Sequence, residues 1–348
     1  MVHTIKRLGM AAGLLGLMAA LAGCHPTTET QAGPSGAATP SPAAGKSLRI
    51  AVIPKGTTHE YWKSIHAGAV KAQQELAGKG TNVEILWKGP AREDDRNAQI
   101  DVVQTFISQK VDGIVLAPLD SQALVQPVAD AAKQKIPVVV IDSGLNSTDY
   151  ASFVATDNKK GGLLAGQQLA KVMGGKGKVI MIRYQQGSAS TEQREAGFLE
   201  AMKAAPGISL ISSDQYAGPT VDTAYKSSQN VLSRFGTQAN GIFMANESST
   251  RGMRLALKDA GLLGKVKFVG FDSSDDLIDA LKKNQLQGLV VQNPFKMGYL
   301  SLLTAVSAIK NEKFEKSIDT GVTLVTPENM STPEMQTLLS PPIDQYLK

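Results

Sequence analysis

The chain has 348 residues, a formal net charge of +5 and a single cysteine. One cysteine excludes an internal disulfide framework and a cysteine-based metal centre. The basic residues are scattered along the chain, so the positive charge gives no support to nucleic-acid binding.

The first residues predict export. Lys6 and Arg7 precede an apolar stretch, from Gly9 to about Ala22, that is shorter than the roughly 20 residues a transmembrane helix needs. This pattern is typical of a secretory signal peptide. The stretch ends in Leu21-Ala22-Gly23-Cys24, which matches the bacterial lipobox. We therefore predict a lipoprotein signal peptide over residues 1–23 and lipidation of Cys24; an ordinary signal followed by a chance cysteine is the alternative.

Residues 24–47 are rich in Thr, Pro, Gly, Ala and Ser. Such a segment buries too little apolar surface to order itself, so we expect a disordered tether between the membrane and the folded body. His25, and not an aspartate, follows the cysteine, which favours the outer membrane where the host has one. The expected location is the periplasm or the cell surface, with the lipid anchor in the cell membrane or the outer membrane.

From Leu48 onward, short apolar runs alternate with helical patterns such as Ile65, Ala69, Ala72 and Leu76. The predicted strands are Leu48–Ile53, Val83–Trp87, Gly113–Ala117, Pro137–Ile141, Phe153–Ala155, Val179–Ile182, Ser209–Ser212, Gly241–Met244, Lys267–Phe271 and Gly288–Val291. Strands that alternate with helices predict parallel sheets covered by helices on both faces.

About ten such units exceed what one small sheet holds. We therefore predict an α/β fold of two three-layer lobes, joined near Ala155-Thr156-Asp157; an eight-unit barrel is the competing layout. Prolines at positions 327, 333, 341 and 342 exclude a long helix or a central strand from the C-terminal tail. We expect the tail to wrap over the surface of one lobe.

Ligands of open parallel sheets bind outside the carboxyl ends of the strands, so the residues that follow each strand are the candidates. They are Lys55, Tyr61, Trp62, Asp142, Ser143, Arg194, Asn246, Asp272 and Gln292. Most of these side chains are planar or forked. The hydroxyls of a sugar both donate and accept, which suits such partners, and its C–H faces stack on aromatic rings.

Some of these residues also have a structural interpretation. Asp142 and Asp272 are equally well explained as helix N-caps, because Asp after a strand often caps the next helix. Asn246 has a similar alternative as a turn residue.

The remaining alternatives concern packing and charge. Arg194 taken alone is better explained as a surface charge on a helix. Tyr61 and Trp62 are alternatively a hydrophobic staple, and Lys55 alternatively balances Glu60. The coincidence of all these residues at one kind of edge favours a binding site.

Catalytic motifs find little support. "VMGGKGK" lacks the Ser/Thr of a phosphate-binding loop, and neither G-x-S-x-G nor H-E-x-x-H occurs. His59 and His66, seven residues apart, leave a metal site on one helix face as a minor alternative. We expect a protein that is not an enzyme, with no catalytic residues, no cofactor and no metal.

Several segments resemble one family. These are "IAVIPKGTTHEYW", "VIDS", "VATDNKKGGLLAGQQLA", "REAGF", "FMAN", "VGFD" and "VVQNPFKMG". Between Leu48 and Val325 the chain resembles the type I periplasmic sugar-binding proteins, the ribose/xylose/galactose-binding family of ABC importers. The lactose-repressor family shares this body, but a lipobox stands here in place of a DNA-binding motif, so we expect no nucleic-acid partner.

The resemblance implies a monosaccharide ligand, an ABC permease and ATPase as partners, and a monomer. It implies a cleft lined by Tyr61, Trp62, Asp142, Arg194, Asn246, Asp272 and Gln292. It also implies an N-terminal lobe of residues 48–156 plus 293–320 and a C-terminal lobe of residues 157–292 plus 321–348. Three hinge crossings, near Thr156, Gln292–Pro294 and Asp319–Gly321, then let the lobes close on the ligand.

Two departures leave the sugar open. Ribose binders carry Asp-Arg where this chain has Asp142-Ser143, and a small polar residue in place of Lys55. Together with Thr191-Glu192-Gln193, these features are also similar to the subgroup that binds the furanosyl quorum signal autoinducer. A lipoprotein that senses a ligand for a receptor is a further alternative to transport.

Overall fold

The computed structural model describes residues 47–57 and 59–347. The predicted signal peptide and Cys24 lie outside the described residues, as does the predicted tether except for Ser47. Among the described residues, no helix has the length and apolar character needed to cross a membrane.

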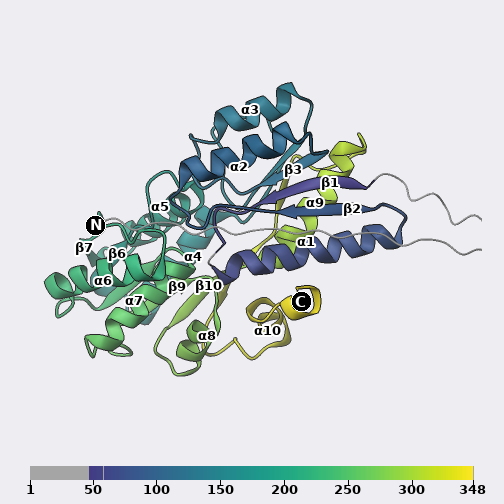
Figure 1. Cartoon of the computed structure of the whole chain (residues 1–348). Helices are drawn as coiled ribbons and strands as arrows, with labels where there is room; N and C mark the ends of the chain where they lie inside the picture. Colours follow the sequence, from purple (N-terminus) through teal and green to yellow (C-terminus); the bar gives the residue numbers. More distant parts are fainter. Residues whose placement is uncertain (1–46, 58, 348) are drawn as a thin grey trace, which may run out of the picture. The chain divides into compact units, whose positions relative to one another are not determined.

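The first sheet is entirely parallel, with the strand order β11-β5-β4-β3-β1-β2. Its strands are β1 (Leu48–Ile53), β2 (Val83–Trp87), β3 (Gly113–Leu116), β4 (Val138–Ile141), β5 (Ser152–Ala155) and β11 (Ser317–Asp319). Helices α1 (Glu60–Gly78) and α9 (Pro294–Ile309) pack on one face, and α2 (Arg96–Ser108) and α3 (Val125–Lys133) on the other (Figure 1).

Burial on both faces explains why these strands are continuous apolar runs. Within β1, Ile50 and Val52 pack against the α1 and α9 side. Ala51 and Ile53 pack against the α2 and α3 side. Because successive side chains of a strand point to opposite faces, a strand covered on both faces has no polar position to alternate with.

The second sheet has the strand order β12-β10-β9-β8-β6-β7, and only β12 is antiparallel to its neighbour. Its strands are β6 (Lys176–Ile182), β7 (Gly207–Ser212), β8 (Gly241–Met244), β9 (Lys267–Phe271), β10 (Gly288–Gln292) and β12 (Val322–Val325). Helices α4 (Asn158–Val172) and α5 (Ala189–Lys203) pack on one face. The other face carries α6 (Val221–Phe235), α7 (Glu247–Asp259) and α8 (Asp275–Lys282).

The two sheets repeat one topology, since β1 to β5 and β6 to β10 have the same spatial order. This confirms the predicted α/β fold of two three-layer halves and excludes the barrel. The chain passes between the sheets after β5, after β10 and between β11 and β12. All ten predicted strands are present, and β6 shows the largest shift at its start, from Val179 to Lys176. The sequence did not predict β11, whose three residues are too few for a periodic pattern.

The C-terminal tail contacts both halves, which corrects the prediction that it lies on one. Helix α10 (Pro333–Leu339) adds Met335 and Leu339 to the core on the α6 to α8 side of the second sheet. Helix α11 (Ile343–Tyr346) packs on α1 of the first half, and the Tyr346 ring lies 5.6 Å from that of Phe295. Two consecutive prolines between α10 and α11 prevent one continuous helix and redirect the chain.

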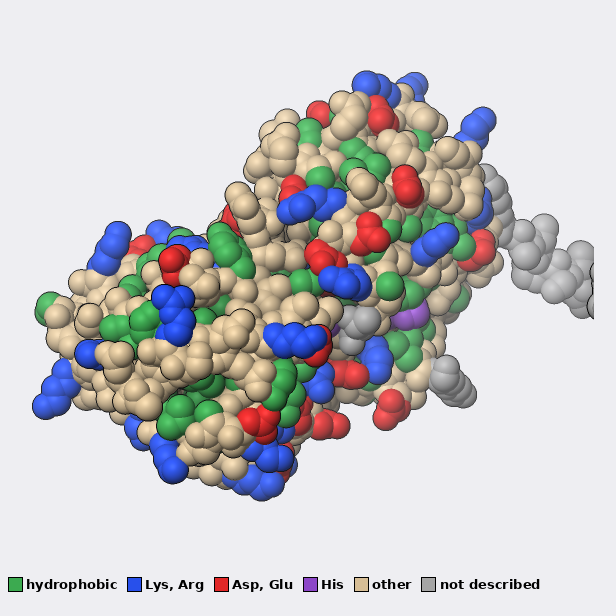
Figure 2. All heavy atoms as spheres, turned by 60° about the vertical axis from the view of Figure 1, so that its left-hand side comes forward, with side chains coloured by type: hydrophobic (Ala, Val, Ile, Leu, Met, Phe, Trp, Pro, Cys, Tyr) green, Lys and Arg blue, Asp and Glu red, His purple; other side chains and the backbone are tan. Residues whose placement is uncertain are grey.

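Charged side chains are interspersed on the surface. On the face drawn in Figure 2, lysine and arginine side chains are scattered over the surface with aspartate and glutamate side chains between some of them, and no broad continuous patch of one sign is visible. This distribution agrees with the scatter of basic residues along the sequence.

Candidate ligand-binding site

Polar and aromatic side chains from both halves line a cavity of about 30 Å³. The first half supplies residues from the loops after its strands and from the start of α1. The second half supplies residues after β6, β8 and β9, from α5, from the start of α7 and from the end of β10. The lining consists of Lys55, His59, Tyr61, Trp62, Glu93, Asp142, Tyr184, Ser190, Thr191, Arg194, Asn246, Glu247, Asp272 and Gln292. The cavity is small because side chains of the two halves bond to one another across it.

Tyr61 and Trp62 lie in the first turn of α1 with their rings edge to face, 5.1 Å apart at 87°. The Tyr61 hydroxyl donates to Asp142 Oδ1 at 2.9 Å. Both rings also pack in the core between α1, α9 and the first sheet. The rings therefore belong to the core and also line the cavity, and the core fixes the orientation that they present to it.

Lys55 is buried and pairs with Asp142, with 2.8 Å between Nζ and Oδ2. Its ammonium also donates to Ser190 Oγ in α5 at 3.0 Å, which joins the two halves. The alternative role of Lys55, balancing Glu60, does not occur, because Glu60 pairs with Lys63. Asp142 is not a helix cap, since β5 and not a helix follows it.

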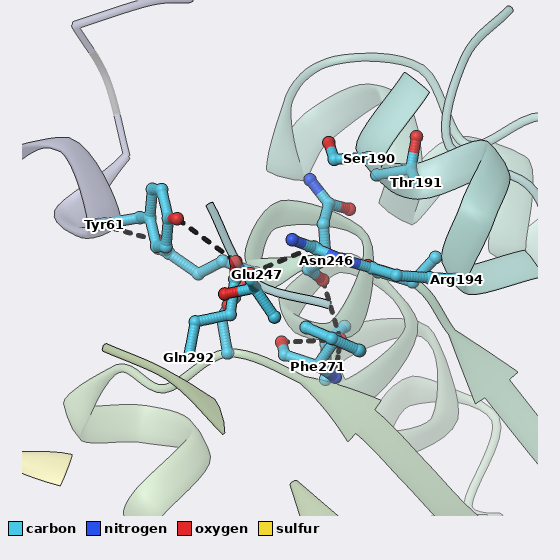
Figure 3. Close-up of polar contacts among 12 residues, drawn as sticks. Tyr61, Ser190, Thr191, Arg194, Asn246, Glu247, Phe271 and Gln292 are labelled. Carbon is cyan, nitrogen blue, oxygen red and sulfur yellow. Dashed lines mark hydrogen bonds and ion pairs between the residues drawn. The ribbon is translucent and has the colours of Figure 1, made fainter. Parts of the chain in front are cut away.

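Arg194 is 2% exposed and is not a surface charge. Its Nε donates to Asn158 Oδ1 at 2.8 Å, and its Nη1 donates to the carbonyl of Ala245 at 3.0 Å. The guanidinium lies 4.0 Å from the centre of the Phe271 ring. Figure 3 shows Arg194 with Ser190 and Thr191 on one side of the site and Tyr61 on the other.

A glycine sets the position of the helix that carries Arg194. A Cβ at Gly162 of α4 would collide with the backbone carbonyl of Arg194 in α5. The absence of a side chain therefore lets α4 and α5 approach closely and fixes the depth at which the guanidinium lies.

Asp272 and Gln292 bond to each other, with Gln292 Nε2 donating to Asp272 Oδ1 at 2.8 Å. Burial raises the pKa of Asp272, and the charge of Arg194, 3.7 Å away, opposes this shift. Asp272 does not cap the next helix, because the N-cap of α8 is Ser274. Asn246 caps α7 and also lines the cavity.

Ser143, predicted as a ligand contact, is not among the residues that line the cavity. It is fully buried, and its Oγ accepts the backbone N–H of Ser190 at 3.1 Å. Its contact is therefore with the second half of the protein.

The predictions missed six lining residues, of which Glu93, His59 and Tyr184 form one cluster. Glu93 belongs to the charged segment "GPAREDD", which is typical of an exposed loop. Tyr184 lies two residues beyond the end of β6, the same offset as Lys55 from β1, and this signal could have identified it. Ser190, Thr191 and Glu247 are the other three.

Within the cluster, His59 and Glu93 carry opposite charges at neutral pH. His59 Nδ1 lies 2.7 Å from Glu93 Oε1. Burial alone lowers the pKa of His59, but the carboxylates of Glu93 and Glu247 and the carbonyl of Pro219 together raise it to about 9. Burial alone raises the pKa of Glu93, but His59, Lys55 and Trp62 together reverse this and lower the pKa to about 2.

His66 lies in a different environment from His59. Its ring stacks on Trp87 at 4.3 Å between centres, and burial lowers its pKa. The two histidines therefore do not share a site, and no group of three or more potential metal ligands is found among the described residues.

Comparison with known proteins assigns the family. Residues 50–313 match the family described as "Periplasmic binding protein domain". The chain is 30% identical over 288 residues to the D-ribose/D-allose-binding protein of Pseudomonas aeruginosa. This alignment covers 80% of the present chain and 88% of the Pseudomonas protein.

Two solved structures are similar in fold. A carbohydrate transporter solute binding protein from Agrobacterium radiobacter, in complex with D-arabinose, has a TM-score of 0.79 and 37% identity over 84% of this chain and 99% of that one. An ABC transporter solute binding protein from Agrobacterium vitis, with bound D-fucose, has a TM-score of 0.79 and 36% identity over 84% of this chain and 100% of that one. Two sheets of one topology, polar side chains that meet between them and these matches agree: the chain belongs to the type I periplasmic sugar-binding proteins, within the family of periplasmic binding protein domains.

Proposed function

We propose that this protein is the lipid-anchored, extracytoplasmic substrate-binding protein of an ABC importer, and that it binds a neutral monosaccharide between its two lobes. One observation supports neutrality above all. Each carboxylate that lines the cavity lies next to a cationic side chain. The pairs are Lys55 with Asp142 at 2.8 Å, His59 with Glu93 at 2.7 Å, Arg194 with Asp272 at 3.7 Å and Arg251 with Glu247 at 3.3 Å.

Such pairing leaves no unmatched charge for an ionic ligand. The desolvation of a buried ion without a partner costs several kcal/mol in proteins. The site would therefore accommodate a uronate or a sugar phosphate poorly. The hydroxyls of a neutral sugar can instead donate to carboxylates and accept from amides and guanidinium groups.

The proposed contacts divide by chemistry. Tyr61 and Trp62 stack on the C–H faces of the sugar, and Lys55 adds a donor. Hydroxyls of the sugar bond to Asp142, Arg194, Asn246, Asp272 and Gln292. The names of the relatives support this assignment, since D-ribose, D-allose, D-arabinose and D-fucose are all neutral monosaccharides.

Closure would present the loaded form to the permease and the ATPase. In this proposal the lobes are residues 48–156 with 293–320 and residues 157–292 with 321–348, apart from α11, which packs on the first lobe. The three crossings between the sheets act as the hinge. The protein works as a monomer and catalyses no reaction.

A screen of ligands tests the proposed binding. Neutral pentoses, hexoses and deoxysugars should include one that raises the melting temperature by mass action, with affinity then measured by calorimetry. The uronic acid and the phosphate ester of that sugar should give no shift. A preference for the charged forms, or for the furanosyl quorum signal, would contradict the proposal.

The anchor needs a separate test. The Cys24→Ala variant should lose metabolic labelling with palmitate and move from the detergent phase to the aqueous phase, while its sugar affinity stays unchanged. Retention of label in this variant would contradict lipidation at Cys24.

A further inference from the structure

Glu93 lies in the loop between β2 and α2 and is 4% exposed. Both of its carboxylate oxygens have partners. Oε1 accepts from Trp62 Nε1 at 2.7 Å and contacts His59 Nδ1 at 2.7 Å. Oε2 accepts from the Tyr184 hydroxyl at 2.7 Å.

These partners come from different halves of the protein. In the first half, His59 directly precedes α1 and Trp62 lies in its first turn. In the second half, Tyr184 follows β6. The backbone carbonyl of Glu93 accepts a second bond from that half, from Gln185 Nε2 at 2.8 Å. Glu93 is thus bonded to the ring proposed to stack on the sugar and to the opposite lobe at once.

We propose that Glu93 is a positioning residue that couples the orientation of Trp62 to the closure of the lobes. This inference depends on the proposed sugar-binding function. When the lobes separate, the Tyr184 hydroxyl leaves Oε2, and only His59 and Trp62 still hold the carboxylate. When they close, the same carboxylate joins the indole N–H to Tyr184, so the ring is fixed in the closed form.

The chemistry favours a large effect on ligand release. Hydrogen bonds to an ionised group are roughly twice as strong as neutral ones, and burial strengthens them further. Because His59 supplies the counter-charge, Glu93 stays ionised without help from the ligand. Reopening must break the bond between Tyr184 and Glu93, so this bond slows dissociation of the sugar.

The test uses the full folded protein and the sugar identified by the screen. The chain has two tryptophans, so a Trp87→Phe background leaves Trp62 as the single reporter for stopped-flow fluorescence. Glu93→Gln and Tyr184→Phe should each raise the dissociation rate constant by about tenfold, with a smaller change in the association rate constant. The double variant should dissociate about as fast as Glu93→Gln alone, because the charge-assisted bond of Tyr184 is already lost in that variant.

A matched control exists within one half. Tyr299 donates its hydroxyl to Glu75 Oε2 at 2.7 Å, the same kind of bond, between α9 and α1 and outside the cavity lining. Tyr299→Phe and Glu75→Gln should leave the dissociation rate constant unchanged. A purely structural role for Glu93 would instead lower stability without this specific change in release.

The outcomes separate the two proposals. If the wild type binds none of the sugars, the proposed function is wrong. If the wild type binds but Glu93→Gln and Tyr184→Phe dissociate at the wild-type rate, or if their effects multiply, the coupling is wrong and sugar binding stands. If Glu93→Gln fails to fold by circular dichroism, Tyr184→Phe decides alone, because it removes one hydroxyl and keeps the buried ring.

Discussion

Asp142 and Asp272 occupy equivalent positions in the two sheets. Each directly follows a strand, β4 or β9, and has a left-handed backbone, with φ of 62° and 65°. Each donates its N–H to a carbonyl of the neighbouring strand, to Val154 at 3.1 Å and to Val290 at 2.8 Å. The left-handed region costs about 1–2 kcal/mol for most side chains and less for Asp or Asn. The two lobes thus place their carboxylates by the same strained turn.

This turn predicts an order of stabilities at position 272. Asp272→Asn keeps a residue that tolerates positive φ, so its main effect should be a loss of affinity of at least about tenfold. Asp272→Ala adds backbone strain, so its free energy of unfolding should be about 1 kcal/mol lower than that of Asp272→Gly. Calorimetry and chemical denaturation measure the two effects. Equal stability of the Ala and Gly variants would show that the left-handed turn is not maintained.

Trp62→Ala should weaken binding of the sugar by at least about tenfold, because the ring offers the largest flat apolar surface in the cavity. The lobes should remain folded, since the strands keep their cores. Trp87→Phe is the control, because that ring stacks on His66 outside the cavity. Titration calorimetry provides the affinities. Equal affinity of Trp62→Ala and wild type would remove Trp62 from the site.

The pair of His59 and Glu93 predicts a pH dependence of stability. The pKa of His59 rises from 6.5 to about 9 on folding, so its stabilising contribution is complete below pH 6.5 and is lost as the pH rises through 9. Glu93, with a pKa of about 2, stays ionised throughout this window, and the Glu247 carboxylate also faces His59. The lowered pKa of His66 changes the free energy of unfolding only below about pH 6.5, outside this window.

Denaturant titrations between pH 6.5 and 9 measure this effect. The free energy of unfolding should fall across this range in the wild type and should change less in His59→Gln. His66→Gln should follow the wild type over the same range. Parallel curves for wild type and His59→Gln would contradict the raised pKa.

Gly162→Ala should damage the site from a distance. Its Cβ would collide with the Arg194 backbone, so α5 must move, and overpacking of this kind costs about 1–3 kcal/mol. Sugar affinity should fall with stability, because Arg194 moves away from Asn158 and Asp272. Gly78→Ala, at the end of α1 with open space around it, should stabilise by up to about 1 kcal/mol. Chemical denaturation and calorimetry compare the two variants, and equal behaviour would refute close packing of α4 and α5.

Local chemistry determined much of this protein from the sequence. Strands buried on both faces must be apolar along their whole length, so the ten apolar runs from β1 to β10 were predictable. The helical patterns between them predicted the layers of helices on both faces of each sheet. The carboxyl ends of parallel strands lie at one edge of a sheet, which is why the sequence alone predicts Lys55, Asp142, Asn246 and Asp272 as candidate site residues.

The tertiary structure alone decided which of these groups meet. Glu93 lies in a loop that looks solvent-exposed, and its burial depends on His59, Trp62 and Tyr184, the last of them 91 residues away in sequence. The bond from the Ser190 N–H to Ser143 Oγ and the return of α11 to the first half also depend on contacts between segments distant in the chain. Such contacts follow from how the two halves pack together, and the local preferences of the residues involved do not encode that packing.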